Sequence, residues 1–366
     1  SAATRPVMLI TSDMRQAEQL RDQFAFFTAG QDIPAVIFPD WETLPYDSFS
    51  PYQDIISDRL ATLYRLPRLT HGLLIVAAPT LMQRLPPVEF VTRNSLMLQT
   101  GQRLDLESMR TQLGLAGYQC VSQVMEHGEF AIRGALLDLF PMGSDVPLRI
   151  DLFDDEIDSI KTFDIDSQRS IESREAINLL PAREFPLHEE AIRLFRRQFR
   201  ARFEGDPRAS LTYREVSDGR APGGLEYYLP LFFETTATLF DYLAPSSVMI
   251  SDHRLPDQAR DFFDGIVVRY EQRRYDIERP LLAPSMVYLE PDELLTNLNR
   301  HSRIELQAGS TDCASPAADC FDLSCKRVPP VGIQAKAADP AQALRTAART
   351  LGGKCELLIG QANDLR

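Results

Sequence analysis

The sequence lacks long apolar runs and regularly spaced cysteines. No stretch approaches the roughly 20 consecutive apolar residues of a membrane-spanning helix, and the opening SAATRPVMLITSD lacks the basic-then-apolar layout of a secretory signal. The 366 residues include only five cysteines, an odd number without a regular framework. This pattern favours a reducing compartment over a disulfide-stabilised fold. We therefore expect a cytoplasmic protein with no membrane partner.

An excess of positive charge is also missing. The formal net charge is −13, and residues 95–186 contain 8 Lys+Arg against 16 Asp+Glu, which is a local net charge of −8. Surfaces that bind nucleic acid usually show a basic patch. We therefore expect residues 95–186 to repel DNA phosphates and to bind a protein instead.

The motifs of common active sites are absent too. A phosphate loop needs G-x-x-x-x-G-K-[ST], and the nearest match is Gly352-Gly353-Lys354-Cys355, with Ala348 at the first glycine position and cysteine at the hydroxyl position. A helix C-cap before a strand explains this glycine pair better. Neither a G-x-S-x-G turn nor an H-x-x-x-H pair occurs. We expect no catalytic residue and no bound cofactor in this region.

The remaining cysteines do not predict a metal site. Cys313, Cys320 and Cys325 lack the paired spacing that zinc modules show, and only a distant Cys355 or His301 would complete a set of four ligands. We therefore predict that no metal binds.

Two further segments resemble functional sites but have a simpler structural explanation. Asp154-Asp155-Glu156 imitates the metal-binding acids of an ATPase, but the chemistry of a polar turn explains these residues unaided. The loop PDWETLPYDSFSP places Trp41, Tyr46 and Phe49 where they could stack on bases. It contains no lysine or arginine to meet a phosphate, so we expect a packed loop.

Apolar strands and amphipathic helices alternate in the first third of the chain. Residues 7–12, 35–38 and 72–77 predict strands, with helices around residues 20–27 and 54–66. This alternation predicts an α/β fold around a parallel sheet that is covered on both faces.

The pattern changes near residue 95. A helix over 105–115 is followed by short strands in hairpins, which predicts a separate α+β unit over residues 95–186. Beyond it, Ile192, Phe195 and Phe199 mark one face of a further helix, and residues 247–251 predict another strand.

One predicted strand, Arg149-Ile150-Asp151-Leu152-Phe153, has an unusual exposed face. Side chains alternate along a strand, so Ile150 and Leu152 would face the core while Arg149, Asp151 and Phe153 face solvent. An aromatic side chain beside an arginine is typical of a protein-binding hot spot. Arg133, which opens the strand GALLDLF, would join this patch from one strand away. The same residues also fit a scattered surface.

Four long strings of the chain resemble a known family. They are DWETLPYDSFSPYQDIISDRLATLYRL, IVAAPTLMQRLPP, QVMEHGEFAIRGALLDLFPMGSDVPLRIDLFDDEIDSIKTFDIDSQRS and INLLPAREFP. They resemble the amino-terminal part of the bacterial transcription-repair coupling factors, from about residue 6 to about residue 300. That part of the family is similar to the nucleotide-excision-repair helicase UvrB.

The resemblance implies a domain organisation. Residues 1–94 would form the first part of a UvrB-like, degenerate nucleotide-binding-type α/β domain, and residues 187–305 would complete it. Residues 95–186 would be an inserted α+β domain. Residues 306–329 would be a linker, and residues 330–366 would be part of a third α/β domain.

The resemblance also implies a partner. In both families the inserted domain binds the damage-recognition ATPase UvrA, and the partner-binding positions match Arg133, Arg149 and Phe153. The chain would thus recruit UvrA to RNA polymerase stalled at DNA damage. A distal domain of the full-length relatives can mask the UvrA surface. RNA polymerase, DNA, and ATP with magnesium would bind further domains that are absent here.

Two other functions stay open. An ATP-dependent, UvrB-like DNA helicase fragment would need a phosphate loop, which the resemblance places ahead of residue 1 and which is degenerate in coupling factors. A DNA-binding module built on residues 1–94 would have to overcome the negative charge of the chain.

Overall fold

The computed structural model describes residues 4–307 and, beyond them, Phe321, Gln342 and Thr346. Everything else that the sequence predicts for residues 308–366, including the cysteine cluster and the partial third domain, lies outside the described residues. Below, "the body" means residues 4–94 and 187–307, and "the inserted region" means residues 95–186.

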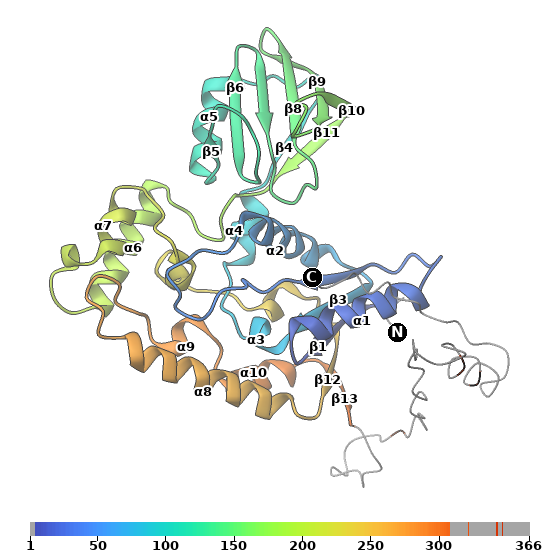
Figure 1. Ribbon diagram of the computed structural model, residues 1–366, viewed down its shortest axis with the longest axis vertical. Coiled ribbons are helices and arrows are strands. Elements are labelled where there is room, and N and C mark those ends of the chain that lie inside the picture. Colours follow the sequence, from blue (N-terminus) through green and yellow to red (C-terminus); the bar gives the residue numbers. More distant parts are fainter. Residues whose placement is uncertain (1–3, 308–320, 322–341, 343–345, 347–366) are drawn as a thin grey trace. The chain divides into compact units, whose positions relative to one another are not determined.

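A five-stranded parallel sheet forms the centre of the body (Figure 1). The strands lie in the order β13-β12-β1-β3-β2, and every neighbouring pair is parallel. Their bounds are β1 Pro6–Thr11, β2 Ala35–Phe38, β3 Gly72–Ala77, β12 Val248–Asp252 and β13 Ser302–Leu306. The α/β fold expected from the alternating strands and helices is confirmed.

Helices pack on both faces of this sheet. On one face Ala17, from α1 (Met14–Phe27), shares a buried cluster with Val7 and Leu73 of the sheet. On the other face Leu60, from α2 (Gln53–Arg65), belongs to the larger core that contains Met8. Each strand of the centre is therefore apolar on both sides, which explains why the sequence shows nearly continuous apolar runs there.

The remaining helices of the body are short, apart from α6 and α8. The α-helices are α3 Ala78–Leu81, α4 Val88–Arg93, α6 Glu189–Arg202, α7 Leu211–Ser217, α8 Leu255–Arg273, α9 Pro284–Val287 and α10 Pro291–Leu298. The 3-10 helices are η1 Leu66–Arg68, η2 Pro207–Ala209, η3 Leu225–Leu231 and η4 Leu239–Tyr242. Within the described part of the chain, no helix combines the length and apolarity needed to cross a membrane.

The inserted region contains a six-stranded sheet in the order β10-β9-β8-β7-β6-β5. Its strands are β5 Gln119–Cys120, β6 Glu129–Arg133, β7 Leu136–Leu139, β8 Leu148–Phe153, β9 Glu156–Phe163 and β10 Ser170–Arg174. All pairs are antiparallel except β5 with β6. A separate two-stranded sheet pairs β4 (Leu96–Gln99) with β11 (Ala176–Leu179), the strands that enter and leave the region.

The helix of the inserted region, α5 (Leu106–Leu115), lies beside β5 and β6 (Figure 1). It begins one residue after the predicted start because Asp105 is its N-cap, whose carboxylate accepts a hydrogen bond from the Ser108 amide. Met109 and Leu113 of α5 belong to the same core as Ile150 of β8. One face of the six-stranded sheet is thereby closed.

A buried ion pair ties the inserted region to the body. The Arg59 Nε of α2 donates to the Glu184 Oε1 at 2.8 Å, and both side chains are completely buried. The indole of Trp41 donates to the second oxygen of Glu184 at 2.9 Å. Trp41 and Tyr46 are 2% and 3% exposed, so this part of the aromatic loop is packed, as expected. Phe49 of the same loop is exposed, which differs from that expectation.

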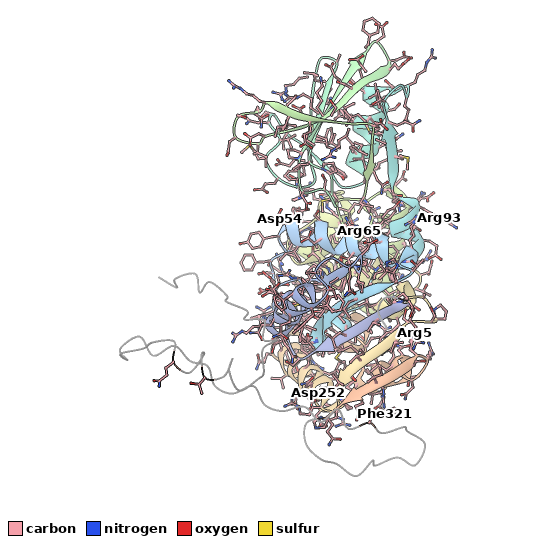
Figure 2. The ribbon with its side chains drawn as sticks, turned by 90° about the vertical axis from the view of Figure 1, so that its right-hand side faces the viewer. Arg5, Asp54, Arg65, Arg93, Asp252 and Phe321 are labelled. Atoms are coloured by element: carbon pink, nitrogen blue, oxygen red, sulfur yellow. The ribbon has the colours of Figure 1, made fainter. Side chains whose placement is uncertain are left out.

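Two more contacts join α2 to the inserted region. The Nδ1 of His127 lies 2.7 Å from the Asp54 carboxylate, and the Gly143 amide donates to the Ser57 hydroxyl at 2.7 Å. Figure 2 labels Asp54 and Arg65 near the two ends of α2. The inserted region is therefore anchored to α2 at several points.

Candidate protein-binding surface

Strand β8 alternates between buried and accessible side chains, as its sequence predicts. Ile150 and Leu152 are buried, Arg149 and Asp151 are half-buried, and Phe153 is 75% exposed. An extra residue in β9 shifts the pairing between Asp151 and Leu152, but the alternation continues through it. The sheet thus has one core face and one face that β8 lines with polar and aromatic side chains.

Phe153 lies at the tip of a hairpin. The turn Asp154–Asp155 follows it, and Glu156 opens β9 opposite Phe153. Asp154 has a left-handed backbone (φ 55°), which aspartate adopts more readily than most residues. Asp154 and Asp155 therefore form a polar turn, as expected, while Glu156 belongs to β9. An apolar ring held in water at a turn loses the free energy that burial would provide.

Arg133 lies at the end of β6 and does not open the next strand, which corrects the sequence-based assignment. The two-residue turn Gly134–Ala135 follows it, and Gly134 has the positive φ of 62° that glycine adopts without strain. β7 then begins at Leu136, directly opposite Arg133. Arg133 is thus two strands from β8, with β7 between them.

A buried aspartate on β7 connects the two arginines, and the sequence did not predict it. Asp138 is completely buried. Its carboxylate accepts hydrogen bonds from the Arg149 Nε at 2.7 Å and the Arg149 Nη2 at 2.9 Å, and also from the Arg133 Nη2. A buried carboxylate is tolerated when it is paired in this way.

Arg149 is held more tightly than Arg133. Besides Asp138, its Nη1 donates to the Gln168 carbonyl at 3.0 Å, and its guanidinium lies over the Phe163 ring at 4.9 Å. Hydrogen bonding to Asp138 raises the pKa of Arg149 above its usual value. The Arg149 side chain is 19% exposed, whereas that of Arg133 is 50% exposed.

These residues share one face of the sheet. The register places Arg133 opposite Leu136, Leu136 opposite Asp151, and Asp138 opposite Arg149. The other end of this face is covered by a small apolar cluster that includes Phe140 and Phe163. The opposite end, which we call the open face, consists of Arg133, Leu136, Arg149, Asp151 and Phe153, with the buried Asp138 between the two arginines. The structure thus places all three predicted site residues on one surface.

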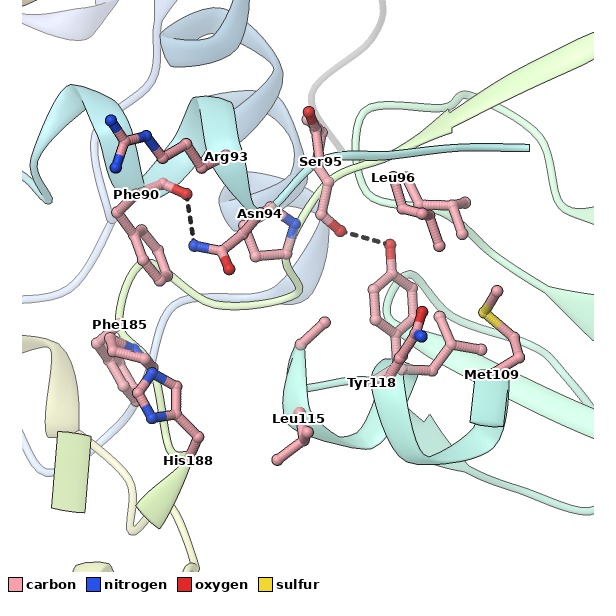
Figure 3. A pocket seen from close by; sticks show the side chains of 17 residues that line it. Phe90, Arg93, Asn94, Ser95, Leu96, Met109, Leu115, Tyr118, Phe185 and His188 are labelled. Atoms are coloured by element: carbon pink, nitrogen blue, oxygen red, sulfur yellow. Dashed lines mark hydrogen bonds between the residues drawn. The ribbon is translucent and has the colours of Figure 1, made fainter. Parts of the chain in front are cut away.

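A pocket lies elsewhere, where β4 and α5 meet the end of α4 (Figure 3). Its volume is about 360 Å³, and most of its lining is apolar, including Phe90, Leu113 and Phe185. Arg93 and His188 are the only titratable side chains of its lining apart from Tyr118, whose hydroxyl donates to the Leu180 carbonyl at 2.8 Å. The side chains that line this pocket do not place a nucleophile within hydrogen-bonding distance of a base.

Two carboxylates, each with an arginine near it, lie at the carboxyl ends of the parallel strands. Figure 2 labels Arg5, which precedes β1, and Asp252, which ends β12, at opposite ends of these strands. The turn from β1 into α1 is Ser12–Asp13, and the Gln16 amide donates to the Asp13 carboxylate at 2.9 Å. That hydrogen bond lowers the pKa of Asp13, and a hydrogen bond from Arg254 lowers the pKa of Asp252.

This turn occupies the position where a doubly wound fold binds phosphates, because β1 is the strand at which the sheet order reverses. It lies within the chain, at residues 12–13, and not ahead of residue 1 as the sequence indicated. Carboxylates there repel a phosphate. Among the described residues, no group of three or more His, Cys, Asp and Glu side chains is placed to hold a metal ion.

Comparisons with known proteins identify relatives of the chain. Residues 96–185 match the family model of the UvrB interaction domain. The chain is 47% identical to the transcription-repair-coupling factor of Escherichia coli over 349 residues, which are 95% of this chain and 30% of that protein. The corresponding protein of Haemophilus influenzae is 44% identical over 341 residues, covering 92% of this chain and 29% of that protein.

A more distant relative, the transcription-repair-coupling factor of Bacillus subtilis, is 28% identical over 262 residues, covering 68% of this chain and 22% of that protein. The chain therefore spans less than a third of the length of the relatives it matches. The open face lies within residues 96–185, where the interaction-domain family matches.

Proposed function

Since the chain is homologous to the amino-terminal part of the transcription-repair-coupling factors and contains a UvrB interaction domain, we propose that it recruits the nucleotide-excision-repair protein UvrA through the open face. Recruitment would bring UvrA to RNA polymerase stalled at DNA damage, with the polymerase and DNA bound by other parts of the full-length protein. We also propose that residues 95–186 act as the UvrA-binding domain.

The exposure of Phe153 carries this proposal. A phenylalanine with 75% of its surface in water, on the same sheet face as two arginines, has the composition of a hot spot. Phe153 would enter an apolar depression on UvrA, and Arg133 would donate charge-assisted hydrogen bonds to a carboxylate at its rim. The local net charge of −8 supports a protein partner over nucleic acid.

The helicase alternative has less support from this chain. ATP hydrolysis needs backbone amides and a lysine around the phosphates, whereas the β1–α1 turn presents the Asp13 carboxylate to that position. We therefore propose that this region acts by binding and not by catalysis. Calorimetric titration with magnesium ATP should give no heat of binding. Micromolar binding would favour the helicase fragment.

The proposal is tested by the affinity of UvrA for the 366-residue chain and two variants. Phe153→Ala and Arg133→Ala should each weaken binding by about 1–3 kcal/mol, which is roughly 5- to 150-fold. Phe49→Ala is the matched control for the first variant, because Phe49 is 71% exposed on the body. Arg260→Ala on α8, with a 58% exposed side chain, is the control for the second. Equal affinity for all four variants would refute the proposal.

A further inference from the structure

Asp138 is the one buried acid of the open face. We propose that it is a positioning residue for partner binding: it holds the Arg133 guanidinium in place for a partner carboxylate, while Arg149 fixes Asp138 from the other side. This inference rests on the proposed function of the open face. It also gives Arg149 an internal role, with Arg133 and Phe153 as the residues that touch the partner.

The position of Asp138 makes this role possible. It lies on β7, between the strands that carry the two arginines, and it has no exposure to solvent. Burying a carboxylate is costly unless the charge is paired and its oxygens are hydrogen-bonded. Arg149 meets both requirements by itself, since its Nε and Nη2 bond the two oxygens of Asp138 separately. The hydrogen bond from Arg133 is therefore additional to what burial of Asp138 requires.

Arg149 is too constrained to serve a partner. Three of its N–H groups donate within the chain, two to Asp138 and one to the Gln168 carbonyl. Its guanidinium also lies over the Phe163 ring. Turning it outward would leave Asp138 with only the Arg133 bond to its Oδ2, so its buried Oδ1 would have no hydrogen bond from the described residues, and an incompletely bonded buried carboxylate is costly.

Arg133 has the opposite properties. One Nη2 bond to Asp138 orients its guanidinium, and no other hydrogen bond is found for it among the described residues. The remaining N–H groups of this half-exposed side chain are free to donate to a carboxylate in the fork geometry that arginine favours. Arg133 can thus bind a partner while keeping its bond to Asp138.

Holding Arg133 in advance strengthens binding. Immobilising a free side chain weakens association by roughly two- to twelvefold, and Asp138 removes most of that cost before the partner arrives. Of the two arginines of the open face, Arg133 has the more exposed side chain, with 50% exposure against 19% for Arg149. The matching feature on the partner is therefore a carboxylate that meets Arg133, beside an apolar depression for Phe153.

A double-mutant cycle in UvrA binding tests the positioning role. In the otherwise unchanged chain, Asp138→Asn should weaken binding roughly three- to tenfold. When Arg133 is already glutamine, the same change should weaken binding by less than about twofold. A purely structural role would give equal losses in both backgrounds, and that result would overturn the inference. Thermal unfolding of each variant shows whether it is folded.

Two further variants separate the possible failures. Wild-type affinity in Phe153→Ala would overturn the docking surface and the positioning role together. Weak binding by Phe153→Ala with wild-type affinity in Asp138→Asn would overturn the positioning role alone. If Asp138→Asn does not fold, Arg133→Lys replaces it, because lysine keeps the charge but not the fork that bridges Asp138 and a partner. Roughly threefold or greater weakening is expected, and unchanged affinity would overturn the inference.

Discussion

Two ion pairs of the molecule join a guanidinium to a buried carboxylate and differ in how exposed the arginine is. They are Arg59–Glu184 and Arg149–Asp138. Arg59 and Glu184 are both completely buried, and Trp41 bonds the second oxygen of Glu184. Asp138 is equally buried, but Arg149 remains 19% exposed. The first pair lies where the inserted region meets the body, and the second lies under the open face.

The difference shows how one interaction serves two purposes. With both partners out of water, an ion pair holds two segments together, and removing either partner leaves an isolated buried charge. With the acid buried between two arginines, the acid is satisfied, and one of the cations, Arg133, remains half-exposed. The first arrangement stabilises the fold, and in our proposal the second presents the Arg133 guanidinium to a partner.

The largest effect is expected from breaking the fully buried pair. Arg59→Ala would leave Glu184 with only the Trp41 indole, so the free energy of unfolding should fall by about 3–5 kcal/mol. Denaturant unfolding measures it. Arg260→Ala is the control, because its partner Asp257 is also exposed, and its cost should stay below about 0.5 kcal/mol. Similar losses in the two variants would remove the distinction between buried and exposed pairs.

A second effect concerns pH. Glu226 is buried and receives a hydrogen bond from the Ser50 hydroxyl at 2.8 Å, and burial raises its pKa from 4.5 to about 7. At a pH between these two pKa values, Glu226 is protonated in the folded state and ionised in the unfolded state. The contribution of Glu226 to stability is therefore complete below about pH 4.5 and is lost as the pH rises through about 7.

When Glu226 is fully ionised, the free energy of unfolding should be lower by on the order of 3 kcal/mol. Unfolding by urea at pH 5 and at pH 8 measures it in the wild-type chain and in Glu226→Gln, which has no proton to release. The glutamine variant should lose less stability over this interval. The same loss in both proteins would show that Glu226 does not titrate as its burial implies.

A smaller effect should distinguish the two arginines of the open face. Arg149→Ala removes two of the three hydrogen bonds to Asp138, so unfolding should become easier by about 1.5–3 kcal/mol. Arg133→Ala removes one bond from a half-exposed side chain and should cost less than about 1 kcal/mol. Thermal unfolding of both variants gives the comparison. The reverse order would contradict the internal role of Arg149.

Features set by local periodicity could be predicted from the sequence. The predicted bounds of β2 and β3 match the structure, because apolar β-branched runs between turn residues identify buried strands. The two faces of β8 also followed from alternation, since the period of a strand is independent of its neighbours. Helix α5 differed by one residue because a capping aspartate resembles a first helical residue in sequence.

Features set by pairing between distant residues could not be predicted. Arg59 and Glu184 are separated by 125 positions, and no local pattern relates them. Asp138 is a single acid in the apolar strand LLDL, and that oddity was the available signal. Its meaning depends on the register that places Arg149 opposite it. The site residues Arg133, Arg149 and Phe153 share one face, and their role in binding stays a prediction.

Photo-crosslinking from position 153 tests the central proposal most directly. A photoreactive p-benzoylphenylalanine would replace Phe153 in one variant and Phe49 in another, since both rings are similarly exposed. After irradiation with UvrA, the chain substituted at position 153 should form a covalent product with UvrA, and the chain substituted at position 49 should form none. Crosslinking from position 49 but not from position 153 would contradict the account.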